Sequence, residues 1–256
     1  MKGQNKVEDS HYMCRVLKTE RENHDTTSLY LEGCHERFTA RRAGQYATIK
    51  ILYDAGWSKP HPFTISCAPE DVALRFTIKK AGMFTSSIPA LKPGTPVLCK
   101  GPYGVFCSDI DEKDTIIMIA GGVGITPFMS VLRHFRNTKA QNTVALFWAN
   151  KTHEDAFAAR ELAEMTHELG LTVIHTLSRD KDAKRHLQKG FPKVLYIPGY
   201  ATREALTKHI QLKDTSYYLC GPPTMQDFVL GELQACSVDP QSVEKENFAY
   251  QTRTSS

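Results

Sequence analysis

The chain has 256 residues, of which 41% are hydrophobic and 23% charged, with a formal net charge of +4 at pH 7. This length is enough for two ordinary domains, and the weak, dispersed charge excludes a nucleic-acid-binding protein. The longest apolar run, residues 115–120, is far shorter than the ~20 residues that span a bilayer, and MKGQNKVEDS at the amino terminus lacks the apolar core of a signal peptide. We therefore expect a cytoplasmic globular protein without membrane insertion.

Seven cysteines are scattered along the chain, and no two of them form a C-x-x-C pair. This odd number and irregular spacing argue against a disulfide framework. They also argue against a zinc or iron–sulfur site with cysteine ligands. The sequence therefore predicts no metal site.

Short runs rich in β-branched and aromatic residues, separated by turn signals, fill the first half of the chain. Turns such as Lys92-Pro93-Gly94 punctuate them, which is typical of a small antiparallel barrel or sandwich. One short helix is expected at about residues 84–91. The expected strands are residues 12–17, 28–31, 46–52, 63–66, 74–78 and 96–100.

Two stretches of this half have the composition of a ligand site. In residues 61–64, strand alternation sends His61 and Phe63 to one face and Thr64 to the other. The simpler interpretation is an edge strand that begins at a proline. Residues 80–85 run from a strand end through a glycine to a helix start, which suits either a phosphate on helix N–H groups or a plain N-capped helix.

The second half alternates strand and helix, which predicts a parallel sheet with helices on both faces and ligands at the carboxyl ends of its strands. Residues 121–127 follow a buried run, and their glycines allow close approach to an anion. Because Pro127 replaces the third glycine of the strict dinucleotide pattern, a plain strand-to-helix turn is the alternative. The expected strands are 115–120, 144–148, 171–177, 195–197 and 217–220, and the expected helices are 127–135, 154–169, 202–209 and 224–235.

Five motifs stand in an order that resembles the ferredoxin–NADP reductase family of flavoprotein dehydrogenases. They are His61-x-Phe63-Thr64, Gly82-x-x-Thr85, Gly101-Pro102-Tyr103-Gly104, Gly121-Gly122-Val123-Gly124-Ile125-Thr126-Pro127 and Cys220-Gly221-Pro222-Pro223. The resemblance runs from about His11 to Tyr250, and its third motif matches the family's turn between domains. It implies an antiparallel β-barrel FAD domain at residues 1–110, followed by an α/β Rossmann-like parallel-sheet NAD(P) domain at residues 111–256.

The resemblance assigns the flavin to the first half. Phe63 would stack on the isoalloxazine ring, and Thr64 would hydrogen-bond it. The family's usual arginine is His61 here, as in the flavin domains of NADPH oxidases and ferric reductases, so FAD affinity is expected to weaken as pH rises. A second phosphate site at a helix start favours FAD over the alternative, FMN. The implied flavin-site residues are His61, Pro62, Phe63, Thr64, Ile78, Lys80, Gly82, Met83, Phe84 and Thr85.

The resemblance assigns NAD(P)H to the second half. Cys220 matches a cysteine near the nicotinamide, although it could be only a small buried hydrophobe. Glu246 and Phe248 match a carboxylate and an aromatic ring that close over the flavin, with Tyr250 as the alternative ring. Ser178-Arg179 suits a 2′-phosphate and favours NADPH over NADH. The implied nucleotide-site residues are Gly122, Gly124, Ile125, Thr126, Pro127, Asn150, Ser178, Arg179, Cys220, Gly221 and Pro222, and the implied catalytic residues are Thr64, Cys220, Glu246 and Phe248.

The activity implied is that of a soluble flavoprotein oxidoreductase, which transfers hydride from NAD(P)H to FAD and then electrons singly to a separate acceptor. We expect an acidic ferredoxin, a flavodoxin or a haem protein, because residues 1–110 hold 15 Lys and Arg against 11 Asp and Glu, whereas residues 111–256 hold 17 of each. The alternatives are a reductase of a quinone, ferric chelate or free flavin, an electron-transfer subunit of a larger redox complex, and a nucleotide-binding regulator without redox activity.

Overall fold

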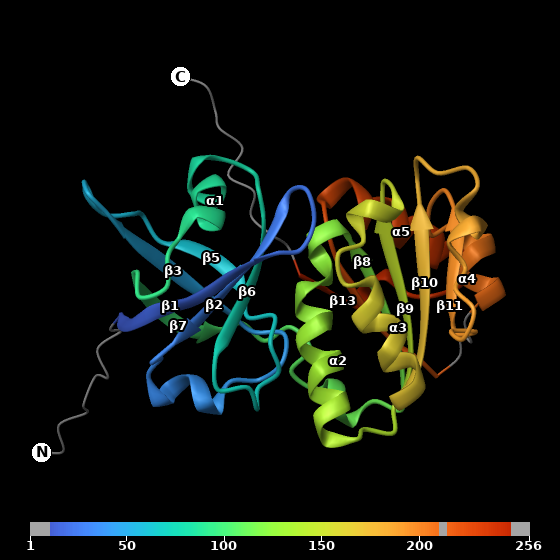
Figure 1. The fold of residues 1–256 in the computed structure, drawn as a ribbon. Helices are drawn as coiled ribbons and strands as arrows, with labels where there is room; N and C mark the ends of the chain where they lie inside the picture. Colours follow the sequence, from blue (N-terminus) through green and yellow to red (C-terminus); the bar gives the residue numbers. More distant parts are fainter. Residues whose placement is uncertain (1–10, 210–213, 247–256) are drawn as a thin grey trace, which may run out of the picture.

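The computed structural model describes residues 11–209 and 214–246, which form two units side by side (Figure 1). The strands of the first unit are β1 (Tyr12–Arg21), β2 (Thr26–Glu32), β3 (Tyr46–Tyr53), β4 (Gly56–Trp57), β5 (His61–Thr64), β6 (Leu74–Lys79) and β7 (Pro96–Tyr103). They form an antiparallel sheet in the order β4-β3-β7-β1-β2-β6, with β5 paired to β3. The sheet curls into a barrel around one apolar core.

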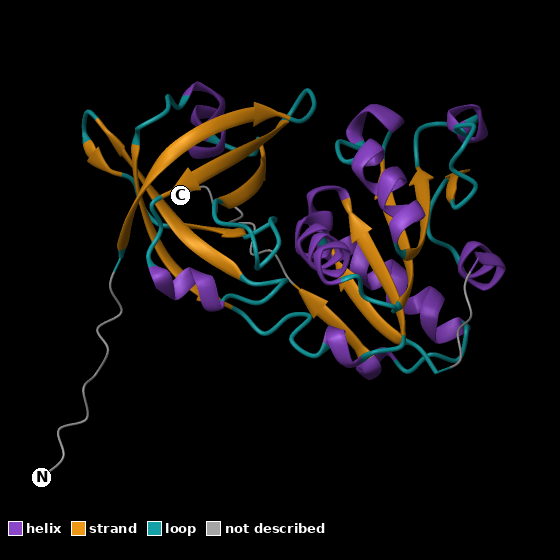
Figure 2. Ribbon diagram, turned by 60° about the horizontal axis from the view of Figure 1, so that its bottom comes forward, coloured by secondary structure: helices purple, strands orange, loops and turns teal. Residues whose placement is uncertain are grey.

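The second unit is a six-stranded parallel sheet between helices (Figure 2). Its strands lie in the order β11-β10-β9-β8-β12-β13, and they are β8 (Thr115–Gly121), β9 (Thr143–Asn150), β10 (Gly170–Leu177), β11 (Val194–Pro198), β12 (Ser216–Cys220) and β13 (Val243–Glu246). The helices are α2 (Thr126–Thr138), α3 (Ala159–Glu168), α4 (Arg203–His209) and α5 (Pro223–Ala235), and the barrel carries α1 (Met83–Ser87). The two-domain fold predicted from the sequence is confirmed.

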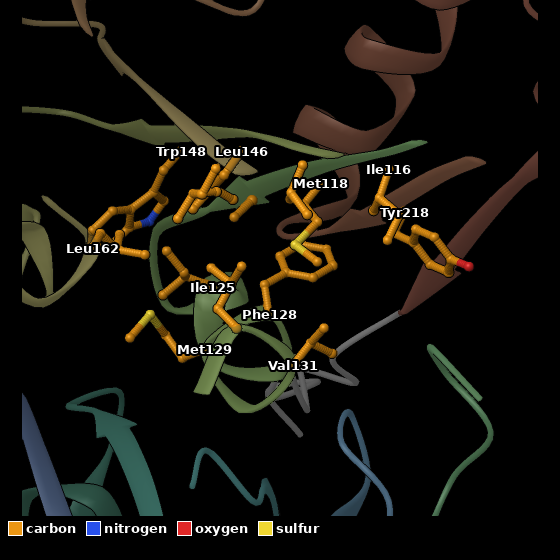
Figure 3. Packing of buried hydrophobic residues seen from close by; sticks show 14 of the residues in the cluster. Ile116, Met118, Ile125, Phe128, Met129, Val131, Leu146, Trp148, Leu162 and Tyr218 are labelled. Atoms are coloured by element: carbon orange, nitrogen blue, oxygen red, sulfur yellow. The ribbon is translucent and has the colours of Figure 1, made fainter. Parts of the chain in front are cut away.

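The central strand β8 is buried on both faces, which explains its uninterrupted apolar sequence. Ile116 and Met118 pack with residues of α2 and α3, whereas Ile117 and Ile119 pack with residues of α4 and α5. Figure 3 shows the first of these cores, in which Phe128 of α2 lies against β8. Because helices cover both faces of the sheet, the ends of its strands are the part that is left exposed.

Several local expectations were wrong in detail. Strand β7 continues to Tyr103, so Gly101 lies in a strand rather than in a turn between domains. The helix expected at 154–169 is interrupted, because the Asp155 carboxylate accepts from the backbone N–H of Thr152 at 2.9 Å and closes a separate turn. Strand β13 was not expected. The short helical turns are η1 (Glu36–Ala40), η2 (Ile88–Ala90), η3 (Ile110–Glu112), η4 (Gly122–Ile125), η5 (His153–Asp155), η6 (Ala183–His186) and η7 (Pro240–Ser242).

The segment just before the expected domain boundary packs with the second unit. Phe106, Cys107 and Ile110 belong to the core that contains α2, and the backbone N–H of Cys107 donates to the Glu244 carboxylate at 2.8 Å. The boundary between residues 110 and 111 stays a prediction. No helix in the described residues has the length and apolar composition needed to cross a membrane.

Candidate functional site

The carboxyl ends of β8 and β12 bring two of the predicted motifs together. The strands are neighbours, with Ala120 opposite Cys220, so the residues that follow them share one edge of the sheet. A Cβ atom on Gly124 would lie 2.8 Å from the carbonyl carbon of Cys220 and 3.0 Å from the Cα of Gly221. Glycine is therefore needed at position 124, because any side chain would push the two loops apart.

The turn after β8 is η4, and α2 begins at Thr126 with Pro127 in its first turn. Gly122 has a φ of +52°, and a Cβ atom there would meet no atom of the described residues within 4 Å. The carbonyl of Gly122 accepts a 2.9 Å hydrogen bond from Nε1 of Trp148, which was not among the predicted site residues. The turn is therefore anchored and open at Gly122, whereas Ile125, Thr126 and Pro127 are buried beneath it.

Asn150, the last residue of β9, has a buried amide group that has no partner among the described residues. Its Nδ2 makes no hydrogen bond in the part of the chain that the structure describes, although only 8% of the residue is exposed. Its carbonyl accepts from the backbone N–H of Ser178 at 3.0 Å, and Arg179, which is exposed, follows directly. An unsatisfied buried amide is a group that a bound ligand can satisfy.

Strand β13 places Glu246 beside Cys220, since the two residues are register partners in adjacent parallel strands. Burial, and then the Glu246 carboxylate, raise the pKa of the Cys220 thiol above its ordinary value. The thiol is therefore protonated at neutral pH. Gln226 of α5, which sequence reasoning missed, donates from Nε2 to the carbonyls of Gly221 and Glu246, both at 2.9 Å. This side chain holds the ends of β12 and β13 together. The sequence indicated it only by its place on a helix next to the Cys220 motif.

The four residues expected to be catalytic do not all fall in the described chain. Thr64 and Cys220 are buried, and Glu246 is half-buried. Phe248 and the alternative covering ring, Tyr250, lie outside the described residues. The structure therefore describes three of the four residues expected to be catalytic.

On the barrel side, three rings stack where β5 begins. The Phe84 ring of α1 lies 3.8 Å from the His61 ring and 6.0 Å from the Phe63 ring, centroid to centroid, in nearly parallel planes. Burial lowers the pKa of His61, which is therefore mostly neutral at pH 7. Sequence reasoning placed Phe84 in a phosphate motif and did not foresee this stack.

The turn into α1 is closed by the Thr85 hydroxyl, which accepts hydrogen bonds from the backbone N–H groups of Ala81 and Gly82 at 2.7 and 3.0 Å. These two amides are thus satisfied within the chain, although Gly82, the N-cap residue of α1, has no side chain to cap the helix. Met83 is 86% exposed, and a Cβ atom on Gly82 would meet nothing within 4 Å in the described part of the chain. Of the other residues predicted for the flavin site, Pro62 and Lys80 are exposed, and Ile78 is buried in the barrel core.

Helix α2 connects the two halves of the site. Arg133 donates to the carbonyl of Ser66, just after β5, and pairs with Glu161 of α3 at 2.6 Å. The Ser130 hydroxyl donates to the carbonyl of Cys67 at 2.6 Å. Although burial acts to raise it, hydrogen bonding and charge from Arg133 lower the pKa of Glu161. Since η4 also contacts β6, the turn at Gly122–Ile125 lies against the barrel.

Residues 118–230 match the family model of the oxidoreductase NAD-binding domain. The chain is 28% identical over 224 residues to NADH-cytochrome b5 reductase 2 of Mycosarcoma maydis, which covers 82% of this chain and 61% of the relative. It is 27% identical over 239 residues to the reductase component of a propane 2-monooxygenase of Mycolicibacterium goodii, which covers 91% and 66%. The chain thus spans less than two thirds of the length of these relatives.

Two solved structures show the same fold. The flavohem-like FAD/NAD-binding domain of nitric oxide dioxygenase from Vibrio cholerae has a TM-score of 0.76 at 20% identity, over 93% of this chain and 98% of that one. A ferredoxin NADP⁺ reductase from Neisseria gonorrhoeae with bound FAD and NADP has a TM-score of 0.74 at 16% identity, also over 93% and 98%. The family model therefore covers part of the second unit, and the described chain has the two-domain fold of these FAD- and NAD(P)-binding structures.

Proposed function

We propose that this chain is an NAD(P)H-dependent flavin oxidoreductase that binds FAD on the barrel, binds NAD(P)H at the carboxyl edge of the parallel sheet and passes electrons to a separate redox protein. The observation that carries the proposal is the close approach of Gly124 to the Cys220 strand end, with the open face of Gly122 beside it. FAD, when bound, supplies the exchange between two-electron and one-electron transfer. One relative is named as an NADH-cytochrome b5 reductase, and another as the reductase component of a propane 2-monooxygenase.

The barrel residues fit a planar cofactor. His61, Phe63 and Phe84 offer ring faces in nearly parallel planes, against which another ring gains stacking energy. The hydroxyl of Thr64 would hydrogen-bond the ring, and the exposed Met83 would cover apolar surface of the cofactor. The exposed Lys80 would attract its phosphates.

The sheet edge fits a dinucleotide. The Asn150 amide, which has no partner within residues 11–209 and 214–246, can donate to the nucleotide. The exposed Arg179 beside Ser178 can bind a 2′-phosphate through two parallel hydrogen bonds, which favours NADPH. The protonated Cys220 would contact the nicotinamide without acting as a base, and Glu246 would orient it. The role of these residues is therefore orientation, which brings the reacting atoms together without a protein proton donor.

The electron acceptor is proposed from charge. The surplus of Lys and Arg in residues 1–110 suits an acidic ferredoxin or flavodoxin, or a haem protein with an acidic face. Salt should then weaken the reaction with that partner, because exposed charges are screened at high ionic strength. A rate that does not depend on salt would favour a small neutral acceptor such as a quinone.

The test is an anaerobic titration of the FAD-loaded protein with NADPH and, separately, with NADH, in which the flavin absorbance is followed. We expect bleaching by either nucleotide, and faster bleaching by NADPH. Arg179→Ala should weaken NADPH binding ~10- to 100-fold and leave NADH binding unchanged, since a hydrogen-bonded charge contributes ~1.5–3 kcal/mol. The matched control is Arg160→Ala, which removes another exposed arginine of this unit. If FAD binds but neither nucleotide bleaches it, the proposed function is wrong.

A further inference from the structure

Three cysteines that are far apart in the sequence meet in the barrel. Cys14 lies on β1 and Cys99 on β7, where the register places Tyr12 opposite Cys99 and Cys14 opposite Val97. Cys14 and Cys99 therefore project to the same face of the sheet. Cys34, which follows β2, completes the group, and the three Sγ atoms all lie within 4.8 Å of one another.

The spacing of these sulfur atoms is close to that of a metal site. A zinc–thiolate bond is ~2.3 Å long, so three thiolates around one zinc ion are ~4 Å apart. The group in the barrel needs to contract by less than ~1 Å to reach this spacing. Within the described residues, no other three His, Cys, Asp or Glu side chains are placed in this way.

The burial of the group favours a divalent ion. Cys14 and Cys99 are 1% and 0% exposed, and a cation held there would leave a net charge of −1 if divalent but −2 if monovalent. The buried guanidinium of Arg41 carries a positive charge, which attracts a thiolate at Cys34. Because buried uncompensated charge is costly, Zn²⁺ fits better than Cu⁺.

We propose that Cys14, Cys34 and Cys99 form a Zn²⁺ site with three thiolate ligands and a fourth position open toward the surface. Each thiol releases a proton to water when it coordinates the ion, and no electron is transferred. The half-buried Cys34 gives access, since His35, the next residue, and Tyr12 line a surface depression of about 540 Å³. The site lies in the barrel core, and its proposal does not depend on the proposed redox function.

The test uses the full chain with FAD bound, stripped of metal by a chelator and kept reduced. Zn²⁺ is titrated against a chromophoric chelator, and we expect one ion per chain. Cd²⁺ is titrated as a spectroscopic probe, and we expect an ultraviolet sulfur-to-cadmium band of three-thiolate intensity. Zn²⁺ should also raise the unfolding temperature, because it binds the folded state.

Cys34→Ser should weaken Zn²⁺ binding at least ~100-fold, since even an outer partner of a ligand contributes 10- to 100-fold. Cys236→Ser, which changes another partly exposed cysteine outside the group, should bind like the natural chain. Equal binding by the natural chain and Cys34→Ser would overturn the proposal, as would uptake of Cu⁺ without Zn²⁺. The cadmium spectrum counts the thiolate ligands of the unaltered chain, so the proposal is testable even if a variant does not fold.

Discussion

The two halves of the candidate site are built in different ways. At the edge of the parallel sheet, close approach of the backbone makes the site: a Cβ atom on Gly124 would lie 2.8 Å from the carbonyl carbon of Cys220. On the barrel, side chains make it: no described residue comes within 4 Å of a Cβ position on Gly82, and the rings of His61 and Phe84 form the surface. Substitutions in the first half should change geometry, whereas substitutions in the second should change affinity.

The largest expected effect comes from breaking the connection between the halves. Arg133→Ala leaves the partly buried Glu161 carboxylate unpaired and removes the bond to the Ser66 carbonyl, so we expect unfolding to become easier by ~3 kcal/mol. Urea unfolding measures this change. Arg160→Ala, from an ion pair whose arginine is 93% exposed, should leave the midpoint unchanged. An equal loss in both variants would contradict the role given to Arg133.

The second-largest effect tests the edge of the parallel sheet, where Gly124 is confined. Gly124→Ala forces the loops after β8 and β12 apart, so we expect a loss of ~1–3 kcal/mol in stability. Reduction of the flavin by NAD(P)H should slow ~100-fold, because small misplacements of reacting groups are costly. Stopped-flow absorbance measures the rate. Gly231→Ala is the control, since a Cβ atom there meets no described residue within 4 Å. Its flavin should be reduced at the rate of the natural chain.

The fall in stability at acid pH should depend on the same ion pair, between Arg133 and Glu161. The pKa of Glu161 is lowered in the folded chain, so its contribution is present above the unfolded value of ~4.3 and is lost as pH falls through the folded value. Glu161→Gln cannot titrate, and its stability should therefore fall less between pH 7 and pH 3. Urea midpoints across this range measure the difference. Parallel curves for the two proteins would refute the assignment.

The smallest effect tests the side-chain half. The lowered pKa of His61 leaves it neutral at pH 8, so FAD affinity should rise about two- to fivefold as pH falls below the ordinary value of 6.5 and the ring gains a charge. His61→Arg stays charged and should show a flat profile between pH 5.5 and 8. Quenching of flavin fluorescence measures the affinity. His167→Arg, on α3, should keep the profile of the natural chain.

Local patterns in the sequence predicted the elements that depend on neighbours along the chain. The apolar run of β8 and the glycines after it indicate a buried strand with an open carboxyl end, because alternate side chains of a strand face opposite cores. Helix ends were less predictable. The turn at Asp155 depends on one carboxylate–amide bond, and Pro89 in the first turn of η2 ends the helix expected at 84–91 after Ser87.

The sequence by itself determined the order of the two domains, the short strands of the first and the alternating strands and helices of the second, and the motifs at the strand ends. All of these are set by residues within a few positions of one another. Only the tertiary structure decided that Glu246 lies beside Cys220, that Phe84 packs on His61, and that three cysteines without a recognisable spacing come together. Such contacts depend on the register between strands and on helix docking. Register and docking are set by packing over the whole core, and no local period in the sequence records them.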